Sequence, residues 1–312
     1  MICLANLLDS TRRYLDNALQ QQPLHTMTPE EVRSIRANAP KVQLTKQVTL
    51  KNIEDRFITV RDGAQIPIRI YTPNGNGLFP VILYYHGGGW VLNDIETSDA
   101  SCQLLAAETN SIVISVGYRL APEFKFPIPV YDAYDAFLWT ADHAKEIDGS
   151  LNEISVMGDS AGGNLATVVT MMSKDLQGPA IKAQILLYPV TDLTFATGSY
   201  NEFAVGFGLE KKDMEWFAHH YLQEESEQTH PYVSPLKAAD LNGLPEAYII
   251  VAENDVLKDE GIAYAKRLQQ FGNRAELHIA EGLVHSFFTK NASFGQEIDE
   301  NINRIRNFLH KN

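Results

Sequence analysis

The stretch that most constrains the fold of this 312-residue chain is a short apolar run that ends in a glycine-flanked serine. Residues 154–157 (Ile-Ser-Val-Met) lead into Gly-Asp-Ser-Ala-Gly at 158–162, and a helix-forming segment comes next. A strand that turns sharply into a helix places its serine, here Ser160, at the end of a sheet, where the hydroxyl can act as a nucleophile. The N–H groups of the following helix would stabilise negative charge beside it. We expect a turn so tight that a side chain at Gly158 or Gly162 would collide with a neighbouring strand or helix.

The Gly-x-Ser-x-Gly pattern is only moderately specific, because it also occurs by chance. A glycine-rich strand-to-helix turn, with Ser160 as an ordinary helix cap, is the simpler interpretation. Other stretches of the chain have to decide between a catalytic and a structural serine.

A second glycine-rich stretch follows the buried strand predicted at residues 80–85. Residues 86–90 read His-Gly-Gly-Gly-Trp. Three successive glycines allow the backbone to approach a ligand closely and to direct N–H groups at it, as an oxyanion hole requires. A flexible glycine turn is the alternative, but a histidine and three glycines directly after a strand favour a functional loop.

Strand and helix patterns alternate along most of the chain, which is typical of a parallel sheet covered by helices on both faces. Alternating apolar residues on either side of Asp62 and Gly63 predict a β-hairpin. Strands are predicted at 56–60, 66–71, 80–85, 112–116, 154–157, 185–190, 248–252 and 275–279, and helices at 98–108, 130–144, 262–271 and 294–309. The sequence therefore predicts an α/β fold with a mostly parallel, eight-stranded sheet.

Two segments outside this alternation predict a helical cap. Residues 1–45 carry an apolar helical face and a second helix that starts with a capping box at Thr28. Residues 195–230 interrupt the alternation and contain an amphipathic helix. We expect one α/β domain over all 312 residues, with the cap formed by about 1–45 and 195–230. An insertion without a function is equally compatible with the length of the second segment.

A catalytic serine needs a histidine base that is oriented by a carboxylate, and in this fold class the acid and the histidine follow the serine. The loops after the last two predicted strands contain Asp255 and His285, at the sheet edge where Ser160 is expected. Glu253 and Asp259 compete for the role of the acid. Asp255 is favoured because, of the three carboxylates, its side chain would have the shortest distance to span to the histidine in the neighbouring loop.

The composition narrows the range of partners. The formal net charge of −13 disfavours nucleic acid and anionic membranes, which attract basic surfaces. The chain has only two cysteines, Cys3 and Cys102, which are too few for a disulfide framework. His219 and His220 are not expected to bind one metal ion together, because adjacent residues of a helix point in different directions. The N-terminus lacks the basic region of a signal peptide, and no apolar run is long enough to span a membrane. We expect a cytoplasmic protein that needs neither a metal nor a cofactor.

Taken together, these stretches resemble the hormone-sensitive-lipase-like (family IV) esterases of the α/β-hydrolase superfamily. The matching stretches lie, in the family's order, at 86–90, 118–123 (Tyr-Arg-Leu-Ala-Pro-Glu), 158–164, 234–236 (Ser-Pro-Leu), 253–259 and 282–287. The resemblance implies that Ser160 is the nucleophile, Asp255 the orienting acid and His285 the base. It also implies a cap built from the N-terminal helices and an insertion before the acid.

The same resemblance implies that the backbone N–H groups of Gly88, Gly89 and Ala161 bind the oxyanion. The sequence departs from the family at two positions: Val256 stands where the acid loop usually has proline, and Gly117 where aspartate usually precedes Tyr-Arg-Leu-Ala-Pro-Glu. Both departures affect loop stiffness, and neither removes a catalytic group.

The expected activity is hydrolysis of carboxylic esters with short acyl groups through an acyl-enzyme. The residues predicted to contact the substrate are Trp90, Phe203, Phe207, Trp216 and Phe217. These bulky aromatics predict a small pocket for neutral esters. A lipase, lactonase, amidase or peptidase would use the same machinery. A non-catalytic small-molecule receptor is disfavoured, because receptors that resemble this family have lost the histidine that is present here as His285. The resemblance also suggests a homodimer through the edge of the last strand.

Overall fold

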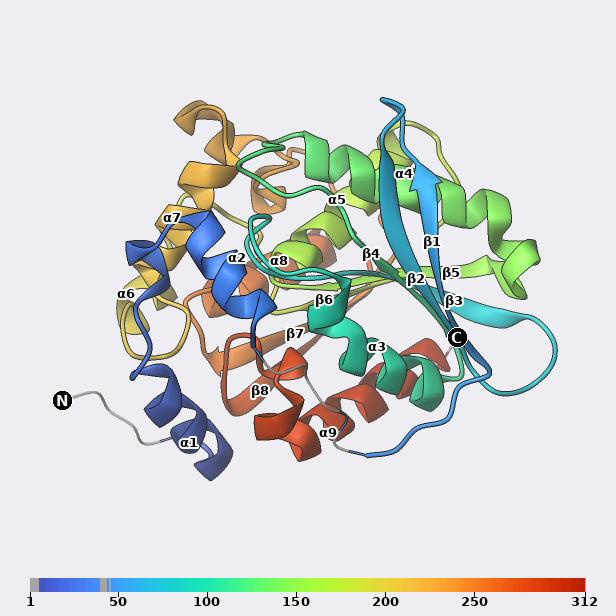
Figure 1. Ribbon diagram of the computed structural model, residues 1–312. Helices are drawn as coiled ribbons and strands as arrows, with labels where there is room; N and C mark the ends of the chain where they lie inside the picture. Colours follow the sequence, from blue (N-terminus) through green and yellow to red (C-terminus); the bar gives the residue numbers. More distant parts are fainter. Residues whose placement is uncertain (1–5, 40–43, 45, 312) are drawn as a thin grey trace.

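An eight-stranded sheet with the order β1-β2-β4-β3-β5-β6-β7-β8 runs through the computed structural model, which describes residues 6–39, 44 and 46–311 (Figure 1). The strands are β1 (Asn52–Thr59), β2 (Gln65–Thr72), β3 (Phe79–Tyr85), β4 (Ile112–Val116), β5 (Gly149–Asp159), β6 (Ala183–Leu187), β7 (Glu246–Asn254) and β8 (Ala275–Val284). β2 pairs antiparallel with β1 and β4, and all other neighbours are parallel. The predicted mostly parallel sheet of eight strands is confirmed.

The last two strands are longer than the sequence pattern predicts. β7 continues to Asn254 and β8 to Val284, because these two residues still pair after a shift in register. Asp255 and His285 therefore follow directly on the ends of two adjacent parallel strands. The prediction ended the first of these strands at residue 252 and the second at 279, before their ends at Asn254 and Val284, since apolar periodicity does not report how far a partner strand continues.

Helices cover both faces of the sheet (Figure 1). One face carries α3 (Ile95–Thr109) and α9 (Asn291–Leu309), and the other carries α4 (Ile128–His143), α5 (Ala161–Asp175) and α8 (Lys258–Gln270). Short 3₁₀ helices are η1 (Leu24–Thr26), η2 (Ala144–Ile147), η3 (Glu225–Thr229), η4 (Pro235–Lys237) and η5 (Phe287–Thr289). α5 is buried from Ala161 to Ser173, which explains why its sequence has no polar face. No helix in the described part of the chain is long and apolar enough to cross a membrane.

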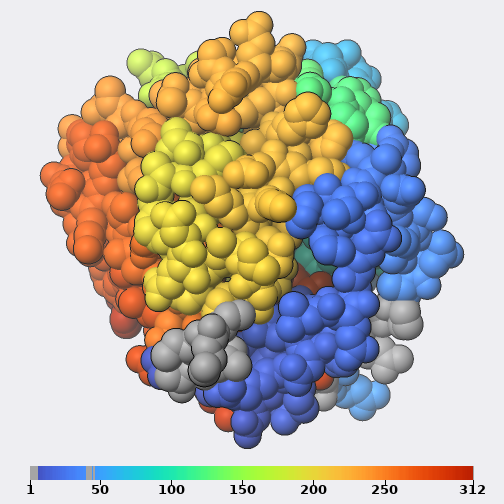
Figure 2. All heavy atoms as spheres, turned by 90° about the vertical axis from the view of Figure 1, so that its left-hand side faces the viewer, coloured from blue at the N-terminus to red at the C-terminus, as the bar shows by residue number. Residues whose placement is uncertain are grey.

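The remaining helices, α1 (Asp9–Ala18), α2 (Pro29–Ala37), α6 (Ser199–Glu202) and α7 (Lys211–Tyr221), gather at one side of the molecule (Figure 1). In Figure 2, the blue atoms of the N-terminal segment and the yellow and orange atoms of the α6–α7 segment meet on this side, with a hollow between them. α2 begins as predicted, because Thr28 and Glu31 form a capping box.

Polar contacts hold the N-terminal segment against α7. The imidazole Nδ1 of His25 lies 2.8 Å from Asp213 Oδ1, and the indole N–H of Trp216 donates to the Met27 carbonyl at 3.0 Å. Cys3 lies outside the described residues, and Cys102 is a buried free thiol.

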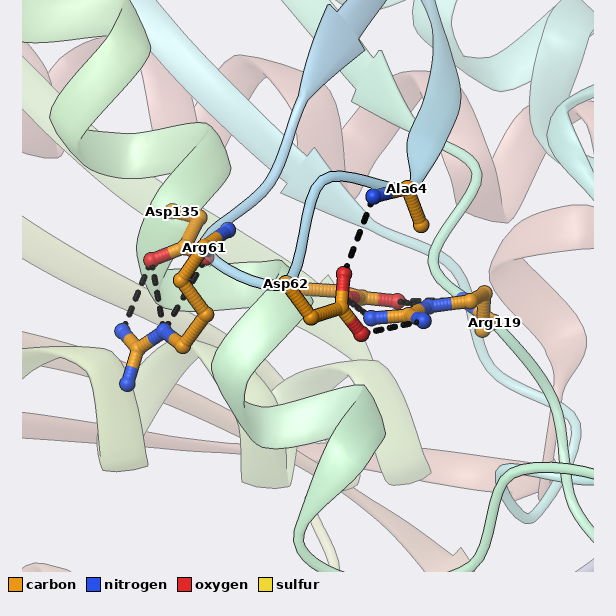
Figure 3. Close-up of polar contacts among 6 residues, drawn as sticks. Arg61, Asp62, Ala64, Arg119 and Asp135 are labelled. Carbon is orange, nitrogen blue, oxygen red and sulfur yellow. Dashed lines mark hydrogen bonds and ion pairs between the residues drawn. The ribbon is translucent and has the colours of Figure 1, made fainter.

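An ion-pair network fixes the β1–β2 turn and the segment before α4 (Figure 3). Arg61 binds Asp135 of α4 at 2.7 Å, while Asp62 binds Arg119 at 2.7 Å. Arg119 also binds Asp132 of α4 at 2.6 Å, and the Asp132 side chain is completely buried. The network therefore joins the antiparallel end of the sheet to α4 and to the stretch at 118–123.

We expect Asp132→Asn to lower the free energy of unfolding by about 3 kcal/mol, because it weakens a buried ion pair and leaves the Arg119 guanidinium poorly neutralised. Asp62→Asn is the matched control, because Asp62 is the exposed partner of the same arginine. It should lower the free energy of unfolding by less than about 1 kcal/mol. Urea unfolding followed by circular dichroism measures both. Equal losses in the two variants would contradict this ranking.

Candidate active site

Ser160 lies at the turn between β5 and α5, with φ 55° and ψ −118°. A non-glycine residue with such a backbone conformation is strained by on the order of 1–3 kcal/mol and needs surrounding structure to hold it. The Ser160 N–H donates to the Leu187 carbonyl at 2.9 Å. A Cβ atom on Gly158 would collide with the Gly162 carbonyl, and one on Gly162 with the Tyr85 carbonyl. Both glycines are therefore required by steric contact, as predicted.

The structure brings together the serine, histidine and aspartate that the sequence pattern singles out. His285 Nε2 lies 2.9 Å from Ser160 Oγ, and His285 Nδ1 lies 2.7 Å from Asp255 Oδ2. The second carboxylate oxygen of Asp255 accepts the N–H of Leu257 at 3.0 Å. Only 6% of Ser160, 6% of His285 and 1% of Asp255 is exposed. The three groups thus form a continuous hydrogen-bond chain that is largely screened from water.

The two rival acids are engaged elsewhere. Glu253 Oε2 accepts the N–H of Gly282 at 2.7 Å, and Asp259 Oδ2 accepts the N–H of Ser199 at 2.8 Å. Neither carboxylate contacts His285, so the geometry selects Asp255 as the partner of the imidazole.

The glycine loop at 86–90 lies beside the turn that carries Ser160. Gly88 has φ +117° and Gly89 φ +60°, conformations that favour glycine. Within the described part of the chain, the N–H groups of Gly88, Gly89 and Ala161 donate to no other backbone carbonyl. Ala161 is the first residue of α5, so its N–H is one of the free donors at a helix N-terminus. The three predicted oxyanion donors are available to a ligand.

Asp159 joins the glycine loop to the serine turn. Its Oδ1 accepts the Tyr84 hydroxyl at 2.7 Å and the Gly87 N–H at 2.9 Å. Burial raises the pKa of Asp159, while these two hydrogen bonds oppose the shift. His86 bonds to the Gly87 carbonyl through Nδ1 at 2.8 Å and stacks on Tyr118, and burial lowers its pKa. The loop is therefore held by buried polar contacts rather than free to move as a glycine linker.

The aromatic residues predicted to contact substrate occupy different positions. Phe217 lies against the glycine loop, since a Cβ atom on Gly89 would collide with its ring. Trp90 has no exposed surface and stacks on Tyr221, with ring centroids 4.2 Å apart. Trp90 thus joins the loop to α7, where Phe217 also lies.

The other three aromatics lie in the inserted segment. Phe203 and Phe207 pack edge to face with centroids 5.0 Å apart, and Lys258 Nζ lies 4.5 Å from the Phe203 ring centre. Trp216 is partly buried and is bonded to the N-terminal segment through Met27. The structure therefore separates Phe217, beside the loop, from Trp216, which joins the two helical segments.

Sequence reasoning missed two residues that shape the site. The Tyr188 ring packs edge-on against His285, with centroids 4.8 Å apart, and Tyr188 follows directly on β6. The sequence analysis placed Tyr188 inside a strand predicted at 185–190. A strand that ends at Leu187 puts Tyr188 at the sheet edge where the site lies, and this position is the signal that could have identified the residue. Asn164 donates to the carbonyls of Val190 and Val233 at 3.0 and 2.9 Å and so fixes α5 to two loops.

The two departures from the family pattern are accommodated locally. The Val256 carbonyl accepts the Ser199 hydroxyl at 2.6 Å, which holds the acid loop without a proline. Gly117 donates to the Pro67 carbonyl at 2.9 Å, and a Cβ atom there would lie 2.8 Å from the Pro67 ring.

Among the residues described, no group of three histidine, cysteine, aspartate or glutamate side chains could hold a metal ion.

Comparison with known proteins identifies the family. Residues 82–289 match the family described as an alpha/beta hydrolase fold. Carboxylic ester hydrolase LipN of Mycobacterium tuberculosis is 44% identical over 72% of this chain, which spans 61% of that protein. Ethyl acetate hydrolase of Pseudomonas putida is 32% identical over 90% of this chain and 89% of its own length.

Solved esterase structures superpose on nearly the whole chain. A thermostable esterase from Pseudomonas putida superposes with a TM-score of 0.91 at 32% identity, covering 98% of this chain and 97% of that one. A Pyrobaculum calidifontis esterase superposes with a TM-score of 0.87 at 37% identity, covering 97% and 98%. The chain belongs to the hormone-sensitive-lipase-like esterases of the α/β-hydrolase superfamily.

Proposed function

We propose that this protein hydrolyses carboxylic esters with short acyl groups through a covalent acyl-enzyme on Ser160. The observation that carries the proposal is the buried hydrogen-bond chain from Asp255 through His285 to the serine hydroxyl. A serine, a histidine and a carboxylate in this order supply a nucleophile, a base and an orienting group. Relatives named as carboxylesterase and ethyl acetate hydrolase support the same reaction.

The acylation step follows from the geometry. His285 Nε2 accepts the Ser160 Oγ proton while Oγ attacks the ester carbonyl. The carbonyl oxygen gains negative charge next to the N–H groups of Gly88, Gly89 and Ala161, which stabilise it. When the tetrahedral intermediate collapses, the imidazolium donates its proton to the departing alcohol and the acyl group stays on the serine.

Deacylation uses the same groups in reverse. Water attacks the acyl carbon while His285 accepts one of its protons, and collapse returns that proton to Ser160 Oγ as the carboxylic acid leaves. Asp255 keeps Nδ1 as the protonated nitrogen of the neutral ring and stabilises the imidazolium when it forms.

Aromatic packing around the glycine loop supports a short acyl group. Phe217 fills the space beside Gly89, and the stack of Trp90 on Tyr221 fixes α7 against the loop. We assign Phe217 to the wall of the acyl pocket, and Trp90 to holding that wall in place. Phe203, Phe207 and Trp216 form the outer part of the proposed cap.

We extend the proposal to the domain organisation, the cellular location and the oligomeric state. We propose one α/β domain whose cap is formed by the helices of about 1–45 and 195–230, acting in the cytoplasm on small-molecule esters. β8 lies at the edge of the sheet and Ile279 on it is 40% exposed, which supports a homodimer through this edge.

The first test is hydrolysis of nitrophenyl esters from acetate to palmitate by the parent protein and by Ser160→Ala. We expect the parent to be fastest below about eight acyl carbons, and the variant to lose roughly 10⁴- to 10⁶-fold in kcat. Ser34→Ala is the control, because Ser34 is an exposed serine, and this variant should hydrolyse the esters at the rate of the parent protein.

Three outcomes would contradict the assignment. A Ser160→Ala variant as active as the parent would reject the nucleophile, and a rate that rises steadily to palmitate would indicate a lipase. Activity only on amides or lactones offered in parallel would move the protein to another class of acyl hydrolase.

The proposed oxyanion loop gives a separate prediction. Gly89→Ala should lower kcat about 100-fold, because the added methyl group collides with Phe217 and shifts a donor N–H group. Gly63→Ala is the matched control, since Gly63 also has a positive φ but no atom within 4 Å of an added Cβ. Both variants should be destabilised by on the order of 1 kcal/mol. Unchanged kcat in Gly89→Ala would reject the role of this loop.

A further inference from the structure

A cavity of about 360 Å³ opens between the β1–β2 hairpin and the start of α3. Its walls come from β1, β2, the stretch between β3 and α3, and the residues that follow β4. None of the three triad residues lines it. Ligand pockets typically have volumes of about 300–1,000 Å³, so this space suits a small molecule. We call it, by its lining residues Phe57, Pro67, His86 and Tyr118, the hairpin cavity.

The hairpin contributes an apolar wall to this cavity. Phe57 and Pro67 are paired across β1 and β2, and both line the cavity. The next pair along the strands, Ile58 and Ile66, points to the opposite face and is buried in the core. Phe57, in contrast, is 69% exposed. An apolar ligand in the cavity would therefore remove part of a phenylalanine ring from water, which favours binding.

The rest of the apolar lining surrounds Gly117. A Cβ atom on Gly117 would lie 2.8 Å from the Pro67 ring and 3.2 Å from Ile95 Cδ1, so the glycine allows both side chains to come close. Leu120 lines the same space and is partly buried. The aspartate that similar sequences usually have at position 117 would add a carboxylate to this lining. With glycine there, the lining stays apolar.

His86 places one hydrogen-bond acceptor in this apolar lining. Its Nδ1 lies 2.8 Å from the Gly87 carbonyl, and because a carbonyl can only accept, Nδ1 carries the ring proton. Nε2 of the neutral ring is then an acceptor. Burial lowers the pKa of His86, which keeps the ring neutral.

The acceptor on His86 has no protein partner. Within residues 6–39, 44 and 46–311, Nε2 forms no hydrogen bond, although only 2% of His86 is exposed. Nε2 is not enclosed by protein atoms either, so it opens into the cavity that His86 lines. The ring is held in this orientation by Tyr118, which stacks on it with centroids 4.3 Å apart. A ligand that donates a hydrogen bond would satisfy Nε2.

The charged side chains around the cavity already have partners. Arg69 binds three carboxylates, at 2.6, 2.8 and 2.9 Å, and Arg56 binds Glu54 at 2.8 Å. Asp94 accepts the Thr97 N–H at 3.1 Å as the cap of α3. Both arginines of the lining are thus neutralised, which disfavours an anionic ligand. A neutral ligand also avoids the cost of moving a charge against apolar walls.

We propose that the hairpin cavity binds a small neutral ring compound with one hydroxyl group, of the phenol class. The hydroxyl donates to His86 Nε2 while the ring packs against Phe57 and Pro67. This binding site goes beyond the esterase function and does not depend on it. It adjoins the glycine loop, because His86 Nδ1 and Asn93 Nδ2 both donate to the Gly87 carbonyl.

Phenol is the probe, and the readout is the nuclear magnetic resonance signal of the His86 ring nitrogens in protein labelled with ¹⁵N-histidine. The chain has nine histidines, so the spectrum of His86→Gln identifies the His86 signals. In the free protein we expect the tautomer with the proton on Nδ1. Phenol should then shift the Nε2 signal saturably, with a Kd on the order of 1 mM. Toluene has the same shape but no donor, and should leave this signal nearly unshifted.

Phe57→Ala should weaken phenol binding about fivefold or more, because it removes a ring from the cavity wall. Leu78→Ala is the control, because Leu78 is another exposed apolar side chain, 66% exposed, that does not line the cavity. It should leave the Kd for phenol unchanged. Both replaced side chains are exposed, so both variants should fold like the parent protein.

Four results would overturn the proposal. These are a proton on Nε2 in the free protein, no Nε2 shift up to about 10 mM phenol, an equal shift with toluene, and an unchanged Kd for phenol in Phe57→Ala. Hydrolysis of nitrophenyl esters by the same samples is read separately. An active esterase that fails the phenol test keeps its proposed function, and an inactive protein that passes it keeps the binding site.

Discussion

The close approach of three chain segments at the serine turn is the constraint on which the rest of the structure depends. β5 ends, Ser160 reverses the chain at a positive φ, and α5 begins against the carbonyl of Tyr85 on β3. Only glycine fits at positions 158 and 162, because any Cβ atom there would meet backbone rather than a flexible side chain. The strain at Ser160 is tolerated since the sheet on one side and the buried helix on the other leave the turn no alternative path.

That turn places Ser160 at the carboxyl edge of the sheet, and the parallel pairing of the strands brings Asp255, His285 and the glycine loop to the same edge. Asp255 directly follows β7, His285 directly follows β8, and the glycine loop directly follows β3. Neighbouring parallel strands lie about 5 Å apart, so residues distant in sequence meet there without a dedicated scaffold. The buried carboxyl of Asp159 then connects the glycine loop to the turn, so the proposed oxyanion donors and the proposed nucleophile are held as one unit.

Helical segments from two parts of the chain pack beside the glycine loop and against each other. α7 places Phe217 against the glycine loop, and Arg36 of α2 donates to Asn93, which in turn donates to the Gly87 carbonyl. His25 and Trp216 bind the two segments to each other.

The sequence by itself determined the sheet, the serine turn and the candidate triad, because these features depend on local patterns: alternating apolar residues, glycines at fixed spacing and polar residues after strands. Tertiary structure decided the rest. Where β7 and β8 end depends on their mutual pairing, and the choice of Asp255 over Glu253 depends on which carboxylate faces the imidazole. Tyr188 and His285 lie far apart in the chain, and their rings meet at a centroid distance of 4.8 Å. Only the pairing of the last strands brings them together, since no local pattern encodes contacts between distant segments.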